Sequence, residues 1–290
     1  MKIKKMFLWL LVFPILVNAQ IKGKVVDEKN NPIAYVNIWV ENENIGTTAN
    51  EQGEFYINAT ADKKLIFTAV GFETLTSKIS ENGVITLKTH IEELEEVVIG
   101  NPKGTEEIEL GDFTNGNCFS FTMGPVIMAQ KMEYNDTIAK HKFLKELTFL
   151  TTSEKDSVKI IVHFYKPNKD GFPGSDLLDE NLIVNLKKGT KKHTLDLKSF
   201  NVKFPKKGLF IGFEWMIIEV NKNKNQYKDS KTKQKKVFFD YQPYLICNKK
   251  SDFERYVFIS GKWNNSTSGS VDSNEKIKQK DIALKLTLTN

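Results

Sequence analysis

The sequence predicts an all-β protein with two sandwich domains, and three observations support this. Short segments in which apolar and polar residues alternate recur through most of the chain, as expected for strands with one buried face. Clusters rich in Asn, Asp, Gly and Pro separate these segments, and none of the segments keeps a helical period. The chain has 290 residues, which is enough for about two domains.

Residues 1–19 have the layout of a secretory signal peptide. Three lysines among the first five residues precede an apolar stretch from Met6 to Val17, and small residues precede a cleavage point after Ala19. The apolar stretch of about 12 residues is shorter than the roughly 20 residues of a transmembrane helix. We therefore predict an exported protein that begins at Gln20 and has no transmembrane span after cleavage, with a retained membrane anchor as the alternative.

Composition and charge exclude several classes of protein. Hydrophobic residues make up 40% of the chain, which supplies ordinary cores. With only 2 Cys, the chain is neither a disulfide-dense scaffold nor a protein with a four-cysteine zinc site. The formal net charge of +6 falls to about +3 without the three signal-peptide lysines, which is too small to indicate nucleic-acid binding.

Residues 20–89 are expected to form the first domain. Strand patterns occupy Ile21–Val26, Tyr35–Val40, Gly46–Thr48, Glu54–Ile57, Lys64–Phe72 and Val84–Leu87. Alternation along the second of these segments predicts that Val36, Ile38 and Val40 face the core. Strands at this spacing without helical segments are typical of a small β-sandwich.

Several motifs of this domain follow one another in an order typical of a known family. They are Gly23-x-Val25-x-Asp27, Pro32 to Ile38, Gly46-Thr47-Thr48, Asn50-x-x-Gly53-x-Phe55 and Leu65-x-Phe67-x-x-Val70-Gly71-Phe72-Glu73. This series resembles the carboxypeptidase-like regulatory domain, a seven-stranded, transthyretin-like sandwich common at the N-terminus of exported Bacteroidetes proteins and outer-membrane receptors. The resemblance implies a packing or docking module without catalytic residues, located in the periplasm or at the outer membrane.

An acidic linker is expected over residues 90–112. Its segment 94–100 looks like the TonB-box-like strand that follows this domain in TonB-dependent receptors, where the strand pairs with the energy-coupling protein. Val97, Val98 and Ile99 would form the docking strand here. A plain linker or edge strand is the alternative, because the roughly 190 remaining residues are too few for a plug and a barrel of about 22 strands.

Residues 113–290 are expected to form the second domain, a jelly-roll-like β-sandwich of about eight strands. Strand patterns occupy Lys145–Leu150, Val158–Tyr165, Leu182–Leu186, His193–Leu197, Gly208–Ile217, Val237–Phe239, Tyr244–Ile246 and Ile282–Leu288. The segment Gly208–Ile217 is apolar on both faces, so it is expected at the centre of a sheet.

Two groups of residues in the second domain are candidates for binding. Trp263 and Tyr256 have the flat aromatic faces and polar neighbours that suit a sugar, with ordinary sandwich packing as the alternative. Lys231, Lys233 and Lys235 belong to a lysine-rich segment. This segment is either a contact for lipopolysaccharide, acidic glycans or an anionic membrane, or a solvated loop between two strands.

The chain has no recognisable catalytic constellation, so we predict no enzyme activity, no metal site and no cofactor. His90 and Glu93 match the His-x-x-Glu ligand pair of zinc carboxypeptidases by spacing, but that chemistry needs a third ligand and an α/β catalytic domain. The loop with Asp170 and Asp176 lacks the spacing of an EF-hand, so a structured turn is expected there. His163, on a strand, is expected to be a packed or solvent-facing side chain.

Export permits a disulfide, for which Cys118 and Cys247 are the candidates. The sequence as a whole predicts a non-catalytic, exported binding or scaffolding protein of the Gram-negative cell envelope. Its expected partner is an envelope protein or a glycan, and not a nucleic acid. An accessory role in TonB-dependent uptake through segment 94–100 is one alternative, and a metallo-carboxypeptidase-like enzyme is another.

Overall fold

The computed structural model describes residues 20–80, 82–90, 104–114, 118–122, 124–249, 252–265 and 280–290, without the side chains of 118–122. The predicted signal peptide lies outside these residues. Strands make up 54% of the chain and helices 3%, which confirms the all-β fold class. The described helices are α1 (Asp136–Lys140) and the short 3-10 helix η1 (Lys198–Phe200). In the described part of the chain, no helix has the length and apolar character needed to cross a bilayer.

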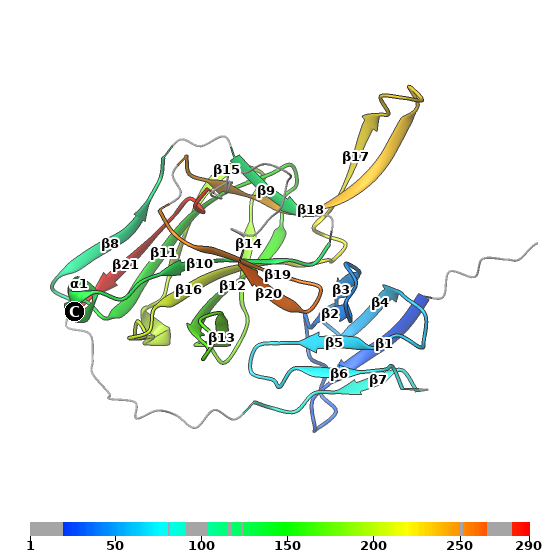
Figure 1. Cartoon of the computed structure of the whole chain (residues 1–290), viewed down its shortest axis with the longest axis horizontal. Helices are drawn as coiled ribbons and strands as arrows, with labels where there is room; N and C mark the ends of the chain where they lie inside the picture. The colour runs from blue at the N-terminus through cyan, green and yellow to red at the C-terminus, as the bar shows by residue number, and fades with distance from the viewer. Residues whose placement is uncertain are drawn as a thin grey trace, which may run out of the picture.

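Seven described strands build the first domain, which confirms the predicted seven-stranded sandwich (Figure 1). They are β1 (Gln20–Val26), β2 (Asn37–Val40), β3 (Gly46–Thr48), β4 (Glu54–Asn58), β5 (Leu65–Thr68), β6 (Leu75–Ser77) and β7 (Val84–Thr86). One sheet has the strand order β4-β1-β7 and the other has the order β3-β2-β5-β6. β1 pairs antiparallel with β4 and parallel with β7.

β2 and the residues just before it are buried on both faces of the sheet. Val36, Ile38 and Val40 belong to the core of the first domain, as their alternation predicts. Tyr35 and Trp39, which alternate with them, pack against the second domain. The sheet β3-β2-β5-β6 therefore lies between the core of its own domain and the second domain.

The second domain has fourteen described strands in two sheets, and not the eight or so that we expected. The first sheet consists of β13 (Pro173–Asp176), β12 (Val158–Pro167), β16 (Leu209–Trp215), β10 (Ile127–Met132), β19 (Arg255–Ile259) and β20 (Lys262–Asn265), in that order, with β14 (Leu182–Leu186) also paired to β12. The second consists of β17 (Lys222–Lys228), β18 (Lys235–Cys247), β11 (Phe143–Ser153), β21 (Leu284–Thr289) and β8 (Glu107–Asp112), with β15 (Gly189–Asp196) on β11 and β9 (Cys118–Thr122) on β18. Sequence patterns missed strands such as β17, because it carries almost no apolar residues.

β16 is a central strand, as its two apolar faces predict. It lies between β12 and β10, and every one of its residues is buried. Ile211 and Phe213 point into the core between the two sheets, where the ring centroids of Phe213 and Phe149 are 5.0 Å apart. Phe210 and Glu214 lie on the opposite face of the strand. That outer face is turned towards the first domain.

β8 shortens the expected linker. Glu107–Asp112 was assigned to the acidic linker 90–112, but it pairs antiparallel with β21 as part of the second domain. Ile108 and Leu110 alternate with the acidic residues of this strand and pack against the core. The carboxylates on its outward face made the segment resemble a linker.

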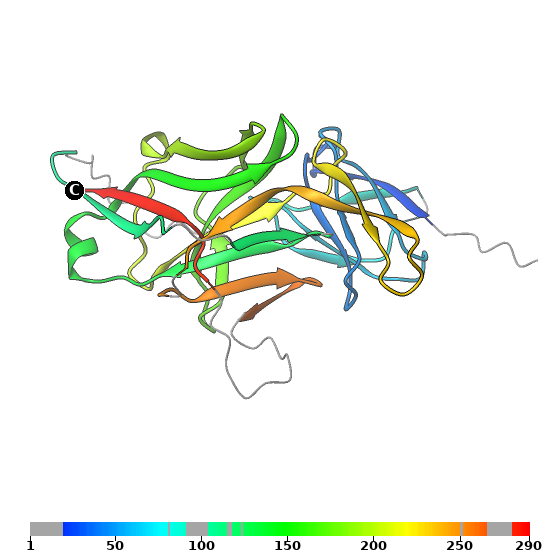
Figure 2. The same cartoon turned by 90° about the horizontal axis from the view of Figure 1, so that it is seen from above.

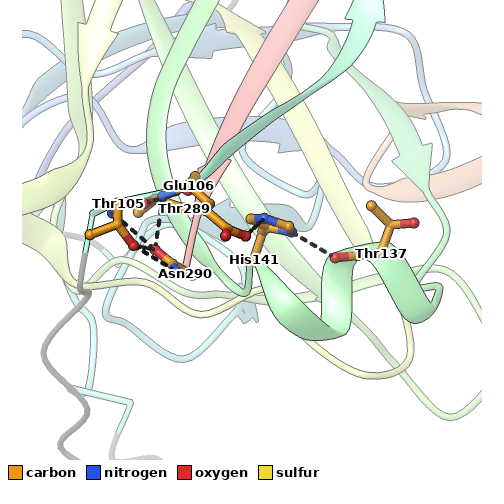
Figure 3. A network of polar contacts seen from close by, with 6 residues as sticks. All are labelled: Thr105, Glu106, Thr137, His141, Thr289 and Asn290. Carbon is orange, nitrogen blue, oxygen red and sulfur yellow. Dashed lines mark hydrogen bonds and ion pairs between the residues drawn. The ribbon is translucent and has the colours of Figure 1, made fainter.

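Polar contacts hold the start of β8 against β21 and α1 (Figure 3). Oδ1 of Asn290 accepts hydrogen bonds from the backbone N–H groups of Thr105 at 3.1 Å and Glu106 at 3.2 Å. The hydroxyl of Thr289 donates to the carbonyl oxygen of Glu106 at 3.0 Å, and the Glu106 carboxylate lies 3.4 Å from Nε2 of His141. The chain therefore enters the second domain at a fixed position.

Apolar contacts join the two domains, which lie side by side in Figures 1 and 2. The ring of Trp39 in β2 meets Phe258 in β19 edge-on, with centroids 6.0 Å apart. Ile66 of β5 lies against the β19–β20 turn at Gly261, where an added Cβ would come within 2.3 Å of the isoleucine side chain. This close approach explains the glycine in that turn.

Polar contacts complete the junction between the domains. Nζ of Lys159 in β12 donates to the hydroxyl of Tyr35 at 2.8 Å and forms an ion pair with Glu51 at 2.9 Å. The backbone N–H of Ile217 donates to the hydroxyl of Thr48 at 2.9 Å. These contacts specify one arrangement of the two domains.

Candidate functional site

A cavity of about 1110 Å³ lies at the boundary between the two domains. The first domain contributes residues 68–74, which include the motif residues Gly71 and Phe72, and also His90. The second domain contributes side chains of β12, β13 and β16 together with Trp263 of β20. Because both domains line the cavity, a molecule bound there would contact both.

The outer faces of β12 and β16 form one wall of the cavity, which we call the floor. His163 and Tyr165 of β12 line it, whereas the alternating Val162 and Phe164 point into the core. Gly212 of β16 lies directly opposite His163 in the ladder. A Cβ at Gly212 would lie 2.8 Å from the ring of Tyr165 and 3.3 Å from Cβ of His163, so the glycine makes room for both rings.

Three buried ionisable side chains meet on this floor. Nδ1 of His163 lies 2.7 Å from Oδ2 of Asp176 in β13, and Nε2 lies 3.0 Å from Oε2 of Glu214 in β16. The side chains of the three residues are only 3%, 8% and 7% exposed. We call them the charged cluster.

One oxygen of the charged cluster has no hydrogen-bond partner among the described residues. Oδ1 of Asp176 accepts hydrogen bonds from the backbone N–H groups of Phe164 at 3.3 Å and Leu178 at 3.1 Å. Oε1 of Glu214 is buried and contacts no donor among the described residues. Glu214 is one of the residues that line the cavity, so this unpartnered acceptor belongs to a side chain at the cavity wall.

The two carboxylates keep His163 charged. Burial alone would lower the pKa of His163, but hydrogen bonds to Asp176 and Glu214 raise it to about 9, so the ring is an imidazolium at neutral pH. One cation therefore faces two carboxylates, and one negative charge is left over. Burial, and then the charges of the same carboxylates, raise the pKa of Tyr165 well above 10, so its hydroxyl stays neutral. The floor suits a ligand that donates hydrogen bonds.

Aromatic rings flank the charged cluster. The ring of Tyr165 stacks on His163 with centroids 5.1 Å apart. Trp263 meets Tyr165 edge-on at 5.6 Å and Phe258 at 5.3 Å. Trp263 is partly exposed and lines the cavity. The structure thus places this predicted binding residue next to the charged cluster, while sugar binding itself stays a prediction.

Tyr256, the other aromatic candidate, packs inside the second domain. It is 6% exposed, its hydroxyl donates to Glu254 at 2.9 Å, and its ring packs edge-on against Phe210 at 5.1 Å. Burial and the hydrogen bond to Glu254 raise its pKa to about 12. Tyr256 does not line the cavity, and its contacts are those of the packing alternative.

The lysine candidates belong to a different region. Lys231 and Lys233 lie in the loop between β17 and β18, and Lys235 begins β18. All three are exposed, and Figure 1 shows this hairpin projecting from the sandwich. The predicted binding residues are therefore divided between the cavity and this hairpin.

The charged cluster was not predicted from the sequence. Asp176 fell in a loop interpreted as a turn, and Glu214 was one polar residue in an otherwise apolar strand. A signal was present in β12, where Ile161 and Tyr165 make the face that carries His163 apolar as well. A strand with two apolar faces is covered on both sides, so a histidine on it is buried and needs partners.

Two predicted sites fall wholly or partly outside the described residues. Val97, Val98 and Ile99 are among the residues left out, so the docking strand stays a prediction. His90 lines the cavity, but Glu93 is not described, so the spacing pair is not tested. Within the described ranges, no group of three or more His, Cys, Asp or Glu residues is placed to hold a metal ion.

The cysteine candidates lie on neighbouring strands. Cys118 of β9 and Cys247 of β18 are direct partners in the ladder, and Cys247 is buried. Opposed residues in antiparallel strands have Cα atoms about 4.5–5.5 Å apart. A disulfide tolerates a Cα separation of up to about 7 Å. The bridge remains a prediction, which peptide mapping under non-reducing conditions tests.

Comparisons with known proteins bear mainly on the first domain. Residues 21–99 match the profile of the CarboxypepD_reg-like domain, which confirms the resemblance predicted from the motifs. No curated protein matches the chain. Among solved structures, the chain is similar to the cysteine protease and lectin-like domains of Cwp84, a surface layer associated protein of Clostridium difficile, with 10% identity and a TM-score of 0.40. That match covers 84% of this chain but only 45% of the other.

Proposed function

We propose that this protein is a non-catalytic, exported binding protein of the Gram-negative cell envelope, and that the cavity between its domains binds a glycan. The observation that carries the proposal is that partly exposed Trp263 and Glu214, whose buried Oε1 has no hydrogen-bond partner among the described residues, line the same cavity. A sugar offers an apolar ring face to an aromatic side chain and hydroxyl groups to a hydrogen-bond acceptor. The signal-peptide pattern and the first domain's family support the location.

The carboxylate of Glu214 favours a hydroxyl-bearing ligand on energetic grounds. A buried acceptor without a partner costs about 1–3 kcal/mol, and more when it is charged. A ligand hydroxyl that donates to it recovers this cost, and a hydrogen bond to a charged group contributes about 1.5–3 kcal/mol.

The state of His163 supports binding over catalysis. A general base at neutral pH needs a free ring nitrogen, and a ring with a pKa of about 9 is protonated there. Both ring N–H groups already donate to carboxylates, so neither is available to protonate a leaving group in the cavity. The ring instead holds Asp176 and Glu214 in place.

A glycan array probed with the purified protein and three variants tests the proposal. Trp263→Ala removes the aromatic face, and Glu214→Gln puts an amide where the ligand meets the carboxylate. Tyr56→Ala is the control, because Tyr56 is 49% exposed on β4, away from the cavity. We expect the first two changes to weaken glycan binding about ten-fold or more, which corresponds to about 1.4 kcal/mol, and the control to have no effect.

Two results would overturn the proposal. If the native protein binds no glycan on the array, the proposed ligand class is wrong. Hydrolysis of a glycan or peptide by the purified protein, abolished in His163→Gln, makes the charged cluster catalytic. Thermal unfolding of every variant shows whether lost binding reflects a lost fold.

A further inference from the structure

A two-stranded arm extends from the second sheet of the second domain. It consists of β17, the first half of β18 and the loop between them, residues 222–241, and Figure 1 shows it projecting beyond the sandwich. Residues opposite each other in an antiparallel ladder share a face, and faces alternate along each strand. One face of the arm therefore carries Lys222, Lys224, Gln226, Lys228, Lys235, Val237, Phe239 and Tyr241. We call this the basic-apolar face.

The basic-apolar face exposes large apolar side chains. Val237 is 48% exposed and Phe239 is 44% exposed, two of the highest values for large hydrophobic residues in the described chain. Lys222 partly covers Phe239, with its Nζ 4.8 Å from the ring centroid. On the opposite face Phe238 meets Tyr227 edge-on at 5.9 Å, and Tyr227 is itself 49% exposed. Val237 and Phe239 are two residues apart on one strand, so two exposed side chains without a polar group lie next to each other on this face, which indicates a contact surface.

Every charged side chain on the basic-apolar face is a lysine. Its positions include no acidic residue, and none of Lys224, Lys228 and Lys235 forms an ion pair with a described residue. Lys222 reaches Glu219 at 3.3 Å, at the base of the arm. Three to four cations thus flank Val237 and Phe239 without a carboxylate among them.

The acidic residues of the arm are engaged elsewhere. Asp229 forms an ion pair with Lys236 at 2.7 Å and accepts backbone hydrogen bonds within the hairpin loop. Asp240 lies on the opposite face, is 2% exposed, and accepts a hydrogen bond from Asn225 at 2.8 Å. The cations of the basic-apolar face therefore remain available to an external anion.

We propose that the basic-apolar face docks onto an anionic lipid bilayer. Lysines beside an anionic leaflet contact the phosphate headgroups, and apolar side chains between them enter the boundary with the acyl chains. A soluble polyanion would satisfy the lysines but would leave Val237 and Phe239 in water. A bilayer satisfies both, and the paired strands hold the two kinds of side chain on one side.

Sedimentation with lipid vesicles tests this inference on the purified protein. The probes are vesicles of phosphatidylcholine alone and vesicles of phosphatidylcholine and phosphatidylglycerol in equal parts. We expect binding to the anionic vesicles only, weakened by added salt. Lys224→Gln with Lys235→Gln should weaken binding about thirty-fold, since each lysine near an anionic surface contributes about five-fold. Val237→Ser with Phe239→Ser should weaken binding at every salt concentration.

A matched control and a soluble competitor keep the test specific. Lys206 and Lys207 form an exposed pair in the turn before β16, and their double change to Gln should leave vesicle binding intact. Failure of the native protein to bind anionic vesicles overturns the inference. So does equally strong binding to soluble dextran sulfate that Val237→Ser with Phe239→Ser does not affect, because the face would then be a polyanion site.

Discussion

The cavity floor and the arm use charged side chains in opposite ways. On the floor, His163, Asp176 and Glu214 are almost fully buried and fix one another at hydrogen-bond distance. On the arm, Lys224 and Lys235 stand in water with no acidic neighbour on their face. Charges on the floor are part of the folded structure, whereas charges on the arm can change without altering the fold.

Because of this difference, a substitution on the floor changes the stability of the fold as well as binding, whereas a substitution on the arm changes mainly binding. Removing one member of a buried ion pair leaves another charge without a partner in a medium of low polarity. Removing an exposed lysine alters only a weak, screened field. Loss of binding by a floor variant therefore needs a stability measurement beside it, while loss of binding by an arm variant can be interpreted directly.

His163→Leu should give the largest loss of stability. Asp176 and Glu214 would stay buried without their shared cation, so we expect the free energy of unfolding to fall by about 3–5 kcal/mol. Urea unfolding at pH 7 measures this. His193→Leu is the control, since His193 has one neutral hydrogen bond, to Thr151 at 2.9 Å, and should cost about 1 kcal/mol. If both variants lost the same free energy of unfolding, the charged cluster would contribute no more to stability than one neutral hydrogen bond.

The charged cluster also predicts a pH dependence of stability. Burial opposes the charge on His163, but its two carboxylates raise the folded pKa to about 9, above the unfolded value of about 6.5. Because the folded pKa is the higher one, the charged His163 ring stabilises the fold fully below about pH 6.5. This contribution is lost as the pH rises through about 9. We expect the native protein to lose on the order of 3 kcal/mol over that interval. His163→Leu lacks the imidazole, so its titration should not show this loss centred near pH 9, and parallel curves would assign the loss to other groups.

Gly212→Ala should have an intermediate effect. The new Cβ would meet the ring of Tyr165 at 2.8 Å, and the ring is held between His163 and Trp263. Overpacking of this kind costs about 1–3 kcal/mol. Gly124→Ala is the matched control, because no atom of the described residues lies within 4 Å of its Cβ position. Comparable thermal unfolding of the two variants would show that the floor tolerates displacement of its rings.

The contrast between the two regions also explains what the sequence could predict. Alternation along 35–40 identified the side chains that face the first core, and two apolar faces identified β16 as central. Both features depend on residues close together in the chain. The charged cluster depends on pairings between β12, β13 and β16, which bring residues 163, 176 and 214 together. No local pattern carries that information.

Strand β17 shows the opposite failure, because its residues were recognised but its structure was not. Its lysines stood out in the sequence as a charged segment, and a solvated loop was the simplest explanation. A strand with both faces largely in water has no apolar alternation to reveal it, and only its ladder with β18 defines it. That ladder matters, since it decides that Val237 and Phe239 share a face with the lysines.

Changes on the arm should have the smallest effect on stability. Val237 and Phe239 are about half exposed already, so replacing both by serine removes little buried apolar area and should shift the free energy of unfolding by no more than about 0.5 kcal/mol per residue. Thermal unfolding of this double variant, of the native protein and of Gly212→Ala compares the three stabilities. A loss as large as that of Gly212→Ala would mean that the two side chains support the fold of the arm. A negligible loss would leave their exposure without a structural reason, as expected for side chains kept for contact with a second surface.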